Sequence, residues 1–338
     1  MDLLEAIDAR HAIRAYTDDP VAPDTLAQLA AEIEACNTES GLHIQMVAGL
    51  DDAFLGLKTH YGRFKGVHNA IALIGAVPGS GESAAADTPA EAEAGPNSPN
   101  IGRTPTAATP TTLQSFKDAE GTPVSHEAAD LQERVGYYGE RLVLRAVQLG
   151  LDTSWAVLDG AENVDPADAW WTLGDGESLV WVIAFGHGAR PGGRRRTKPI
   201  EELASVVDDS VTERTGVAQS AGIADQHADS SGDAALANHS LDNAPDWFRA
   251  GMEAAMKAPT SLSQQPFHFT LHLGDTADAT AGSGDAAADA AADSGTDSDA
   301  DDEVTAEALD GLFAHVGLGC AKYHFEIGAA PHKVKWRQ

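Results

Sequence analysis

The chain has little cysteine and no long apolar run. Cys36 and Cys320 are the only cysteines among 338 residues, which excludes a disulfide framework and a paired-cysteine metal site. We interpret both as buried free thiols. No apolar run approaches the ~20 residues that span a bilayer. The N-terminal stretch MDLLEAIDARHAIRAY starts acidic and lacks the apolar centre of a signal peptide. A soluble, cytoplasmic protein is therefore predicted.

Positive charge is also scarce. The chain has 22 lysines and arginines against 52 aspartates and glutamates, a formal net charge of -30. Such a polyanion repels nucleic acid and anionic membranes, so we exclude both as partners, while a small anion can still bind in a local basic pocket. The excess of acidic residues resembles proteins of salt-loving organisms, in which molar salt screens the self-repulsion. We expect a salt-adapted source.

Three segments are unsuited to a hydrophobic core. They are rich in Ala, Asp, Gly, Ser, Thr and Pro, so they bury too little apolar area to offset the entropy lost on ordering. A solvated loop is a better interpretation of these acidic stretches than a site for a basic partner. We predict disordered acidic insertions at 78–112 and 275–303 and a flexible linker at 205–243.

Periodicity and capping signals predict structured blocks between these segments. The longest helix signal has Ser125 as its N-cap and Gly150 as its stop. Helices are predicted at 2–9, 21–37, 125–151, 245–258 and 304–319. Strands are predicted at 42–50, 69–77, 152–159, 179–188, 267–273 and 321–330.

A weak internal repeat relates the two ends of the chain. Residues 23–51 and 245–275 both open with Pro-Asp and continue as amphipathic helix, loop and strand. Any two α+β stretches align this loosely, so spacing alone leaves the question open. A true repeat implies two related halves that pack as a pseudo-dimer, one at 1–204 and one at 244–338.

Two basic clusters stand out in so acidic a chain. The stretch ARHAIRAY at 9–16 brings together Arg10, His11 and Arg14, which alone is more typical of an ordinary surface. The second cluster, GRRRTKPIEEL at 193–203, follows a buried strand and includes Arg196 and Lys198. The planar guanidinium fork matches phosphate geometry. The two clusters together therefore favour a phosphate site.

The loop APTSLSQQPFHF at 258–269 is polar, uncharged and bounded by proline. Its hydroxyls and glutamines suit the hydrogen-bonding edges of a flat heterocycle such as a flavin. The competing interpretation is a helix-to-strand loop that satisfies its own backbone.

These motifs together resemble the nitroreductases. RHAIRAY is similar to the family's opening FMN-phosphate motif, and APTSLSQQPFHF to its Ala-Pro-Ser loop. The stretches at 136–158 and 182–203 resemble its central helix with the following strand and its last strand with a basic exit. The loop comes late in this chain, as in the TM-type members in which one chain mimics the usual homodimer. One flavin site per chain is then expected at the junction of the halves.

The resemblance implies an α+β, nitroreductase-like fold, with a central, mostly antiparallel sheet flanked by helices and two related halves in one chain. Ala12 stands where the family has Ser, Ser263 where it has Asn, and Val157-Leu158 where it has Glu-Gly beside flavin N5. Carried over by position, the implied cofactor-binding residues are Arg10, His11, Arg14, Val157, Leu158, Arg196, Lys198, Pro259, Thr260, Ser261, Ser263 and Gln265.

The implied activity is that of an FMN-dependent oxidoreductase. Hydride would pass from NAD(P)H through flavin N5 to a nitroaromatic, a quinone or a similar small acceptor, with no protein catalytic residue and no metal. No GxGxxG follows a predicted strand, which fits a nicotinamide held over the flavin alone. The alternatives are a non-catalytic flavin-binding or redox-sensing protein, and a scaffold without flavin. The pseudo-dimer makes a monomer the expected state.

Overall fold

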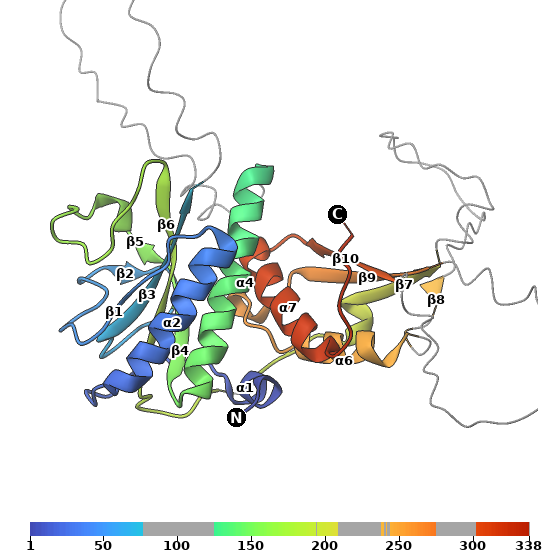
Figure 1. The fold of residues 1–338 in the computed structure, drawn as a ribbon, viewed down its shortest axis with the longest axis horizontal. Coiled ribbons are helices and arrows are strands. Elements are labelled where there is room, and N and C mark those ends of the chain that lie inside the picture. The colour runs from blue at the N-terminus through green and yellow to red at the C-terminus, as the bar shows by residue number, and fades with distance from the viewer. Residues whose placement is uncertain are drawn as a thin grey trace, which may run out of the picture.

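The computed structural model describes residues 1–76, 125–193, 195–208, 238–239, 241, 244–274 and 302–337. Two lobes lie side by side, each with its own sheet, and two long helices meet between them (Figure 1). The predicted insertion at 78–112 lies outside the described residues. Two of the predicted segments contain strand residues. Residues 205–208 and 238–239 of the predicted linker lie in strands, and a strand begins at Glu303, the last residue of the second predicted insertion. Most other residues of these two segments also lie outside the described residues.

The first lobe contains a four-stranded antiparallel sheet. Its strand order is β1 (Gln45–Val47), β3 (Asn69–Ala76), β6 (Glu177–Gly186) and β4 (Asp152–Ala156). β3 and β6 are almost entirely buried on both faces, which explains their continuous apolar runs. β1 is much shorter than the strand predicted at 42–50. A separate ribbon pairs β2 (Lys58–Thr59) with β5 (Leu158–Asp159), and the turn η1 (Ala161–Asn163) follows it.

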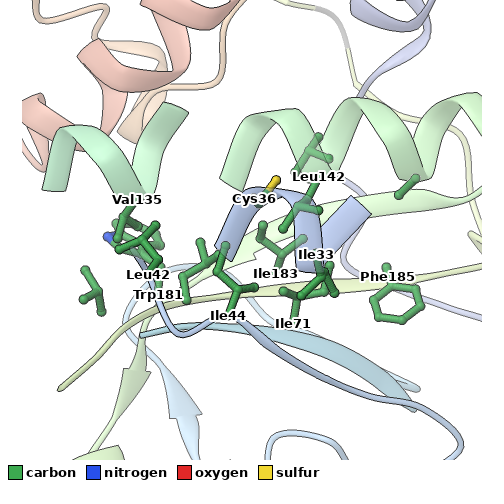
Figure 2. Close-up of a cluster of buried hydrophobic side chains, with 14 of the residues drawn as sticks. Ile33, Cys36, Leu42, Ile44, Ile71, Val135, Leu142, Trp181, Ile183 and Phe185 are labelled. Atoms are coloured by element: carbon green, nitrogen blue, oxygen red, sulfur yellow. The ribbon is translucent and has the colours of Figure 1, made fainter. Parts of the chain in front are cut away.

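Helices α2 (Pro23–Ser40) and α4 (His126–Gln148) cover one face of this sheet. Their apolar side chains interdigitate with those of β3 and β6 to form the first core (Figure 2). Cys36 lies in this core, where burial raises the pKa of its thiol to about 12. Cys320 is also buried and free, so both cysteines are the buried thiols that the sequence predicts.

The predicted ends of α4 are confirmed. The Ser125 hydroxyl accepts a hydrogen bond from the Ala128 amide at 3.2 Å, which satisfies one of the free N–H groups of the first turn. Gly150 has a φ of +81°, a conformation that lets the chain leave the helix without strain. The helix therefore runs within the predicted range of 125–151.

The second sheet is built partly by the first half. Its order is β10 (Glu303–Ala308), β9 (Phe267–Leu273), β7 (Ala204–Asp208) and β8 (Asn238–His239). β7 follows β6 through an extended exit and the turn η2 (Ile200–Glu202), and it pairs in parallel with β9. The other pairings in this sheet are antiparallel. The sequence of the first half thus crosses to complete the second lobe.

The prediction for the C-terminal block was wrong. The expected helix at 304–319 begins as strand β10, and the expected strand at 321–330 is the middle and end of helix α7 (Ala314–Ala329). α7 is buried over most of its surface, between α4 and α6 (Asp246–Ala255). A helix buried all round has no polar stripe, so the 3.6-residue period that reveals surface helices is weak here.

The two lobes meet at a close contact between α4 and α7. A Cβ added at Gly136 would lie 2.1 Å from the carbonyl oxygen of Val316, and one at Gly319 would lie 2.0 Å from that of Glu133. Only glycine allows the two backbones to approach this closely. These helices form the central pair at the junction of the two halves.

The predicted relation of the halves is recognisable in the element order. Helix, strand, antiparallel strand and long helix follow one another as α2, β1, β3 and α4, and again as α6, β9, β10 and α7. Within the described residues, no strand after α7 corresponds to β4 or β6, although Trp336 forms an isolated bridge with Val304 of β10. The described chain therefore has the predicted α+β architecture with two halves, although the latter part of the predicted repeat, in which a strand follows the last helix, does not hold.

Candidate flavin site between the halves

A cavity of about 540 Å³ lies between the two halves. The first half lines it with the segment after α1 (Leu3–Ala9), the end of β4 and the exit from β6. The second half contributes the loop between α6 and β9, which includes the turn η4 (Ser261–Ser263), and the first turn of α7. Ten predicted site residues line it: Arg10, His11, Arg14, Val157, Arg196, Pro259, Thr260, Ser261, Ser263 and Gln265.

The segment after α1 is fixed by the edge of the first sheet. Ala12 lies beside Thr153 of β4, and the Ile13 amide donates to the Thr153 carbonyl at 2.9 Å. Arg14 crosses above Gly62, where a Cβ would come within 2.8 Å of its side chain. Its guanidinium carbon lies 6.0 Å from the centre of the Phe64 ring. Sheet pairing and a glycine together direct Arg14 into the cavity.

The cations around the cavity are not equivalent. Arg10 is buried, and its Nε lies 3.4 Å from the fully buried carboxylate of Glu140. Arg14 and Arg196 are exposed, and neither contacts a carboxylate within the described residues. Two cations without a local counter-charge are therefore available for an anionic ligand, while a third is shared with a protein carboxylate.

Arg195 has a structural task that the sequence did not reveal. Its Nη2 lies within hydrogen-bond distance of the carbonyl oxygens of Ile7, Asp8 and Arg10, at 2.5, 3.0 and 2.6 Å, so its two N–H protons are shared among free carbonyls at and just after the end of α1. Burial, and then the charge of Arg10, lowers the pKa of Arg195. Arg194 lies outside the described residues.

His11 lies among these cations. Partial burial lowers its pKa below the usual value, and the charges of Arg195 and Arg10 lower it further, against an opposing effect of Asp152. The imidazole is therefore neutral at pH 7 in the absence of an anion, and it can both donate and accept a hydrogen bond in the cavity.

The loop after α6 has an unusual backbone. Leu262, Ser263 and Gln265 have φ values of 52°, 56° and 46°, in the left-handed region that non-glycine residues rarely adopt. Such conformations persist only where the surroundings hold them, and they cluster at ligand sites. The hydroxyls of Ser261 and Ser263 have no hydrogen-bond partner in the described part of the chain, so both are available to a ligand.

The two glutamines hold this loop in place. The Gln265 side chain is buried; its amide nitrogen donates to the Met256 carbonyl at 2.9 Å, and its oxygen accepts from the Lys198 amide at 2.6 Å. The Gln264 oxygen accepts from the Leu312 amide at 3.1 Å. Gln265 thus lines the cavity with its amide group already engaged, and it ties the loop to the first half.

Two predicted site residues do not line the cavity. Lys198 lies behind Gln265, and its Nζ is 3.4 Å from the Gln265 carbonyl oxygen. Leu158 packs into the core on the other face of the first sheet and pairs with Thr59. Both follow a lining residue closely in the chain, but the extended backbone turns their side chains to other neighbours.

Aromatic residues form a wall that the sequence analysis missed. Trp181 packs edge-to-face on Phe313 at 4.9 Å and on Trp155 at 5.8 Å between ring centres, and Tyr61 lies 6.0 Å from Phe313. All four line the cavity, and the buried indole N–H of Trp181 has no hydrogen-bond partner among the described residues. Three of them come from the first half and one from the second, so no local pattern in the sequence predicts this wall.

Two further findings concern the described residues only. They include no cluster of three or more His, Cys, Asp or Glu side chains arranged to hold a metal ion. None of their helices has the length and apolarity needed to cross a bilayer.

One antiparallel and one mixed sheet, the central helix pair and a cavity with walls from both halves define a nitroreductase-like protein. A family profile described as "Putative TM nitroreductase" matches residues 2–84 and 122–329. The chain belongs to this TM nitroreductase family. The fold and family predictions are thereby confirmed, whereas salt adaptation, cytoplasmic location and a monomeric state stay predictions. No curated protein matches the sequence.

Solved structures with similar folds share little sequence with the chain. A "putative nitroreductase" of Thermotoga maritima has 14% identity and a TM-score of 0.42, over 97% of this chain and 83% of its own. A nitroreductase family protein of Streptococcus pneumoniae has 15% identity and a TM-score of 0.39, over 60% and 98%. One from Desulfovibrio desulfuricans, solved with FMN, has 19% identity and a TM-score of 0.35, over 60% and 95%.

Proposed function

We propose that the chain is an FMN-dependent oxidoreductase that transfers hydride from NAD(P)H to a small acceptor such as a nitroaromatic or a quinone. One observation carries the proposal. Two motifs that lie far apart in the sequence, the arginine segment at 10–14 and the loop at 259–265, line one cavity. Neither motif alone can hold a ligand that has both an anionic group and a flat polar ring.

The residues present fit FMN. The volume of about 540 Å³ is within the range of ~300–1,000 Å³ typical of small-molecule sites. Arg14 and Arg196 suit a phosphate, because both are cations without a carboxylate partner in the described chain. The hydroxyls of Ser261 and Ser263 and the unpartnered Trp181 N–H suit a ring with carbonyl and imide edges.

When bound, FMN supplies hydride chemistry at its N5 atom, so the reaction needs no protein nucleophile. The protein contributes position and environment. Arg14 and Arg196 hold the anionic group and stabilise negative charge that develops nearby. The strained loop at 261–265 is fixed in advance by Gln265, which lowers the entropy lost on binding.

The apolar and aromatic side chains that line the cavity favour a flat, apolar ligand. Leu262 is 66% exposed although it lines the cavity, and the aromatic rings of Tyr61 and Phe313 also line it. Exposed apolar surface at the edge of a cavity is typical of a binding site. A nicotinamide and an acceptor can occupy this place in turn, with water excluded by the same side chains.

The first test is the visible spectrum of the purified chain, followed by release and identification of the cofactor. About one FMN per chain, bleached by NAD(P)H and reoxidised by menadione or a nitroaromatic, is the expected result. A colourless protein that does not bind added FMN would overturn the proposal. Bound FMN without NAD(P)H turnover would establish the non-catalytic flavin-binding alternative.

A second test concerns the phosphate end. The double variant Arg14→Ala/Arg196→Ala should weaken FMN binding about 100-fold, because each charged hydrogen bond contributes ~1.5 kcal/mol or more. Its unfolding free energy should change by less than ~0.5 kcal/mol, since both side chains are exposed. Arg190→Ala is the matched control, an exposed arginine in the same exit segment that does not line the cavity. Equal FMN affinities in the two variants would refute the phosphate assignment.

A further inference from the structure

A buried ionisable cluster joins the two halves next to the cavity. Glu140 of α4 and His324 of α7 are both fully buried, and Glu140 Oε1 lies 3.0 Å from His324 Nε2. The same oxygen lies 3.4 Å from Arg10 Nε. Glu140 Oε2 accepts from the indole N–H of Trp155 at 3.1 Å. Arg10 and Trp155 line the cavity, whereas Glu140 and His324 do not.

The contacts of His324 determine how many protons the pair holds. Its Nδ1 lies 3.1 Å from the Ala254 carbonyl oxygen, which can only accept, so Nδ1 carries a proton. Its Nε2 faces a carboxylate oxygen, and two lone pairs at that distance would repel. One further proton must therefore lie between Nε2 and Glu140, either on the imidazole or on the carboxyl group.

Both arrangements give the same total charge. An imidazolium with a carboxylate sums to zero, as does a neutral imidazole with a carboxylic acid. The Glu140–His324 pair is therefore neutral as a unit, and the charge of Arg10 is not cancelled. Without His324, the partner of Arg10 would be the ionised carboxylate of Glu140. The charges of Arg10 and Glu140 would then cancel.

The neighbouring groups do not alter this sum. Burial, with the charge of Glu140, raises the pKa of the Cys320 thiol, and burial also raises the pKa of Tyr323, so both stay neutral near pH 7. Lys257 is paired with Asp8 at 2.6 Å. Arg195 is a further cation, committed to the end of α1.

We propose that Glu140 and His324 are positioning residues that hold Arg10 and Trp155 at the cavity wall, and that His324 keeps the positive charge of Arg10 available to an anionic group there. The pair allows a buried carboxylate to orient an arginine without neutralising it. This inference deepens the proposed function, because a phosphate is the anion that FMN would bring. It also explains why a titratable pair is buried at the contact between the halves.

The test compares three variants of the flavin-free full-length chain. His324→Gln keeps a donor for the Ala254 carbonyl but leaves Glu140 and Arg10 to sum to zero. The double variant His324→Gln/Glu140→Gln removes both members and leaves Arg10 with its full charge. His315→Gln is the control, on the same helix and outside both the cluster and the cavity. The probe is inorganic phosphate at pH 8, titrated by calorimetry against chloride at equal ionic strength.

His324→Gln should bind phosphate roughly tenfold more weakly than the wild type, because a unit charge near the anion is lost. The double variant should regain most of that affinity, which a merely structural role for His324 does not predict. FMN should follow phosphate, whereas riboflavin, which lacks the phosphate, should bind all variants alike. Unchanged phosphate binding in His324→Gln, or a double variant as weak as the single one, would overturn the inference.

Two further outcomes keep the claims separate. A wild type that binds phosphate but not FMN refutes the proposed function and leaves this test intact. A wild type that binds neither overturns both. If His324→Gln does not fold, NMR of labelled wild-type chain at pH 8 decides. A proton on His324 Nε2 or on the Glu140 carboxyl is expected, and an ionised Glu140 facing a bare Nε2 would refute the proposal.

Discussion

The two sheets differ in which half of the chain supplies their strands. All four strands of the first sheet come from the first half, and its two central strands, β3 and β6, are long and deeply buried. In the second sheet, β9 and β10 come from the second half, and β7, which continues the first half beyond its predicted end at 204, pairs along β9. The second half is therefore incomplete without the first, and the described lobes form one structural unit.

The same asymmetry is present in the cavity. Among the described residues, the first half provides four lining arginines, Arg10, Arg14, Arg195 and Arg196, whereas the second half provides one cation, Lys257, and a loop of hydroxyl, amide and apolar groups. In a symmetric homodimer each subunit must carry both sets, because the two chains are identical. A single chain with two different halves is free of that constraint. The two halves therefore contribute different groups of residues to the same cavity.

The largest expected effect comes from separating the halves at their closest contact. Gly136→Val would place a side chain against the Val316 carbonyl, where even a Cβ lies at 2.1 Å. We expect the unfolding free energy to fall by more than ~3 kcal/mol, because a backbone clash cannot be relieved by a rotamer change. Gly193→Ala, with open space around the added methyl group, is the control. Denaturant unfolding would show it, and a loss below 1 kcal/mol would mean that the contact yields easily.

The next largest effect is expected from a substitution in β7, the strand that links the first half to the second sheet. Val206 is fully buried in β7, so Val206→Asp places an unpaired carboxylate in the core of the second lobe. A loss of about 3 kcal/mol is expected. Val207→Asp, on the partly exposed face of the same strand, should cost much less. Calorimetry of the wild type should show one transition for both halves, and two separate transitions would contradict the single unit.

Sequence reasoning succeeded where a segment's structure depends on its own residues. β3 and β6 are continuous apolar runs, and α4 carries its own cap at Ser125 and its stop at Gly150. The motif at 10–14 and the loop at 259–265 could be assigned to one site only through their resemblance to the TM-type nitroreductases. That resemblance implies that the two halves of one chain pack like a homodimer. Local patterns alone left that relation open.

Sequence reasoning failed where a residue's structure or role depends on a contact with a distant part of the chain. α7 is enclosed by other helices, so its sequence shows no exposed face and alternates like a strand. The arginines at 10 and 14 look alike in the sequence, yet a carboxylate more than a hundred residues away engages only the first. Gln265 looked like a ligand group, but its partners are backbone atoms of Met256 and Lys198. Tertiary contacts of this kind cannot be read from spacing.

Smaller effects are expected from substitutions in the loop at 259–265. They distinguish residues that hold the loop in place from residues that bind a ligand. Gln265→Ala leaves the Lys198 amide and the Met256 carbonyl without their partner, which should cost ~2 kcal/mol of unfolding free energy. Ser263→Ala removes an exposed hydroxyl that has no protein partner within the described chain. Its stability should change by less than ~0.5 kcal/mol, while FMN binding weakens about threefold. A Ser263→Ala variant that loses stability instead would assign that hydroxyl to the fold.

The smallest effect concerns the charge at the arginine wall. The pKa of His11 is lowered in the folded chain, by burial first and then by Arg195 and Arg10, while the unfolded value is ~6.5. Well above the unfolded pKa of ~6.5 the imidazole is neutral in both states and contributes nothing. Below it the unfolded chain binds the proton more readily, so stability is lost as the pH falls.

His11→Asn should remove that contribution. Its melting temperature should fall less between pH 7.5 and pH 5.5 than that of the wild type, by only about 1–2 °C because the imidazole is largely solvated. His126→Asn, whose side chain is 89% exposed at the start of α4, is the control. Added phosphate should reduce the acid sensitivity of the wild type, because an anion among the arginines favours the imidazolium. A His11→Asn variant as acid-sensitive as the wild type would show that the arginine wall does not repel a proton at this position.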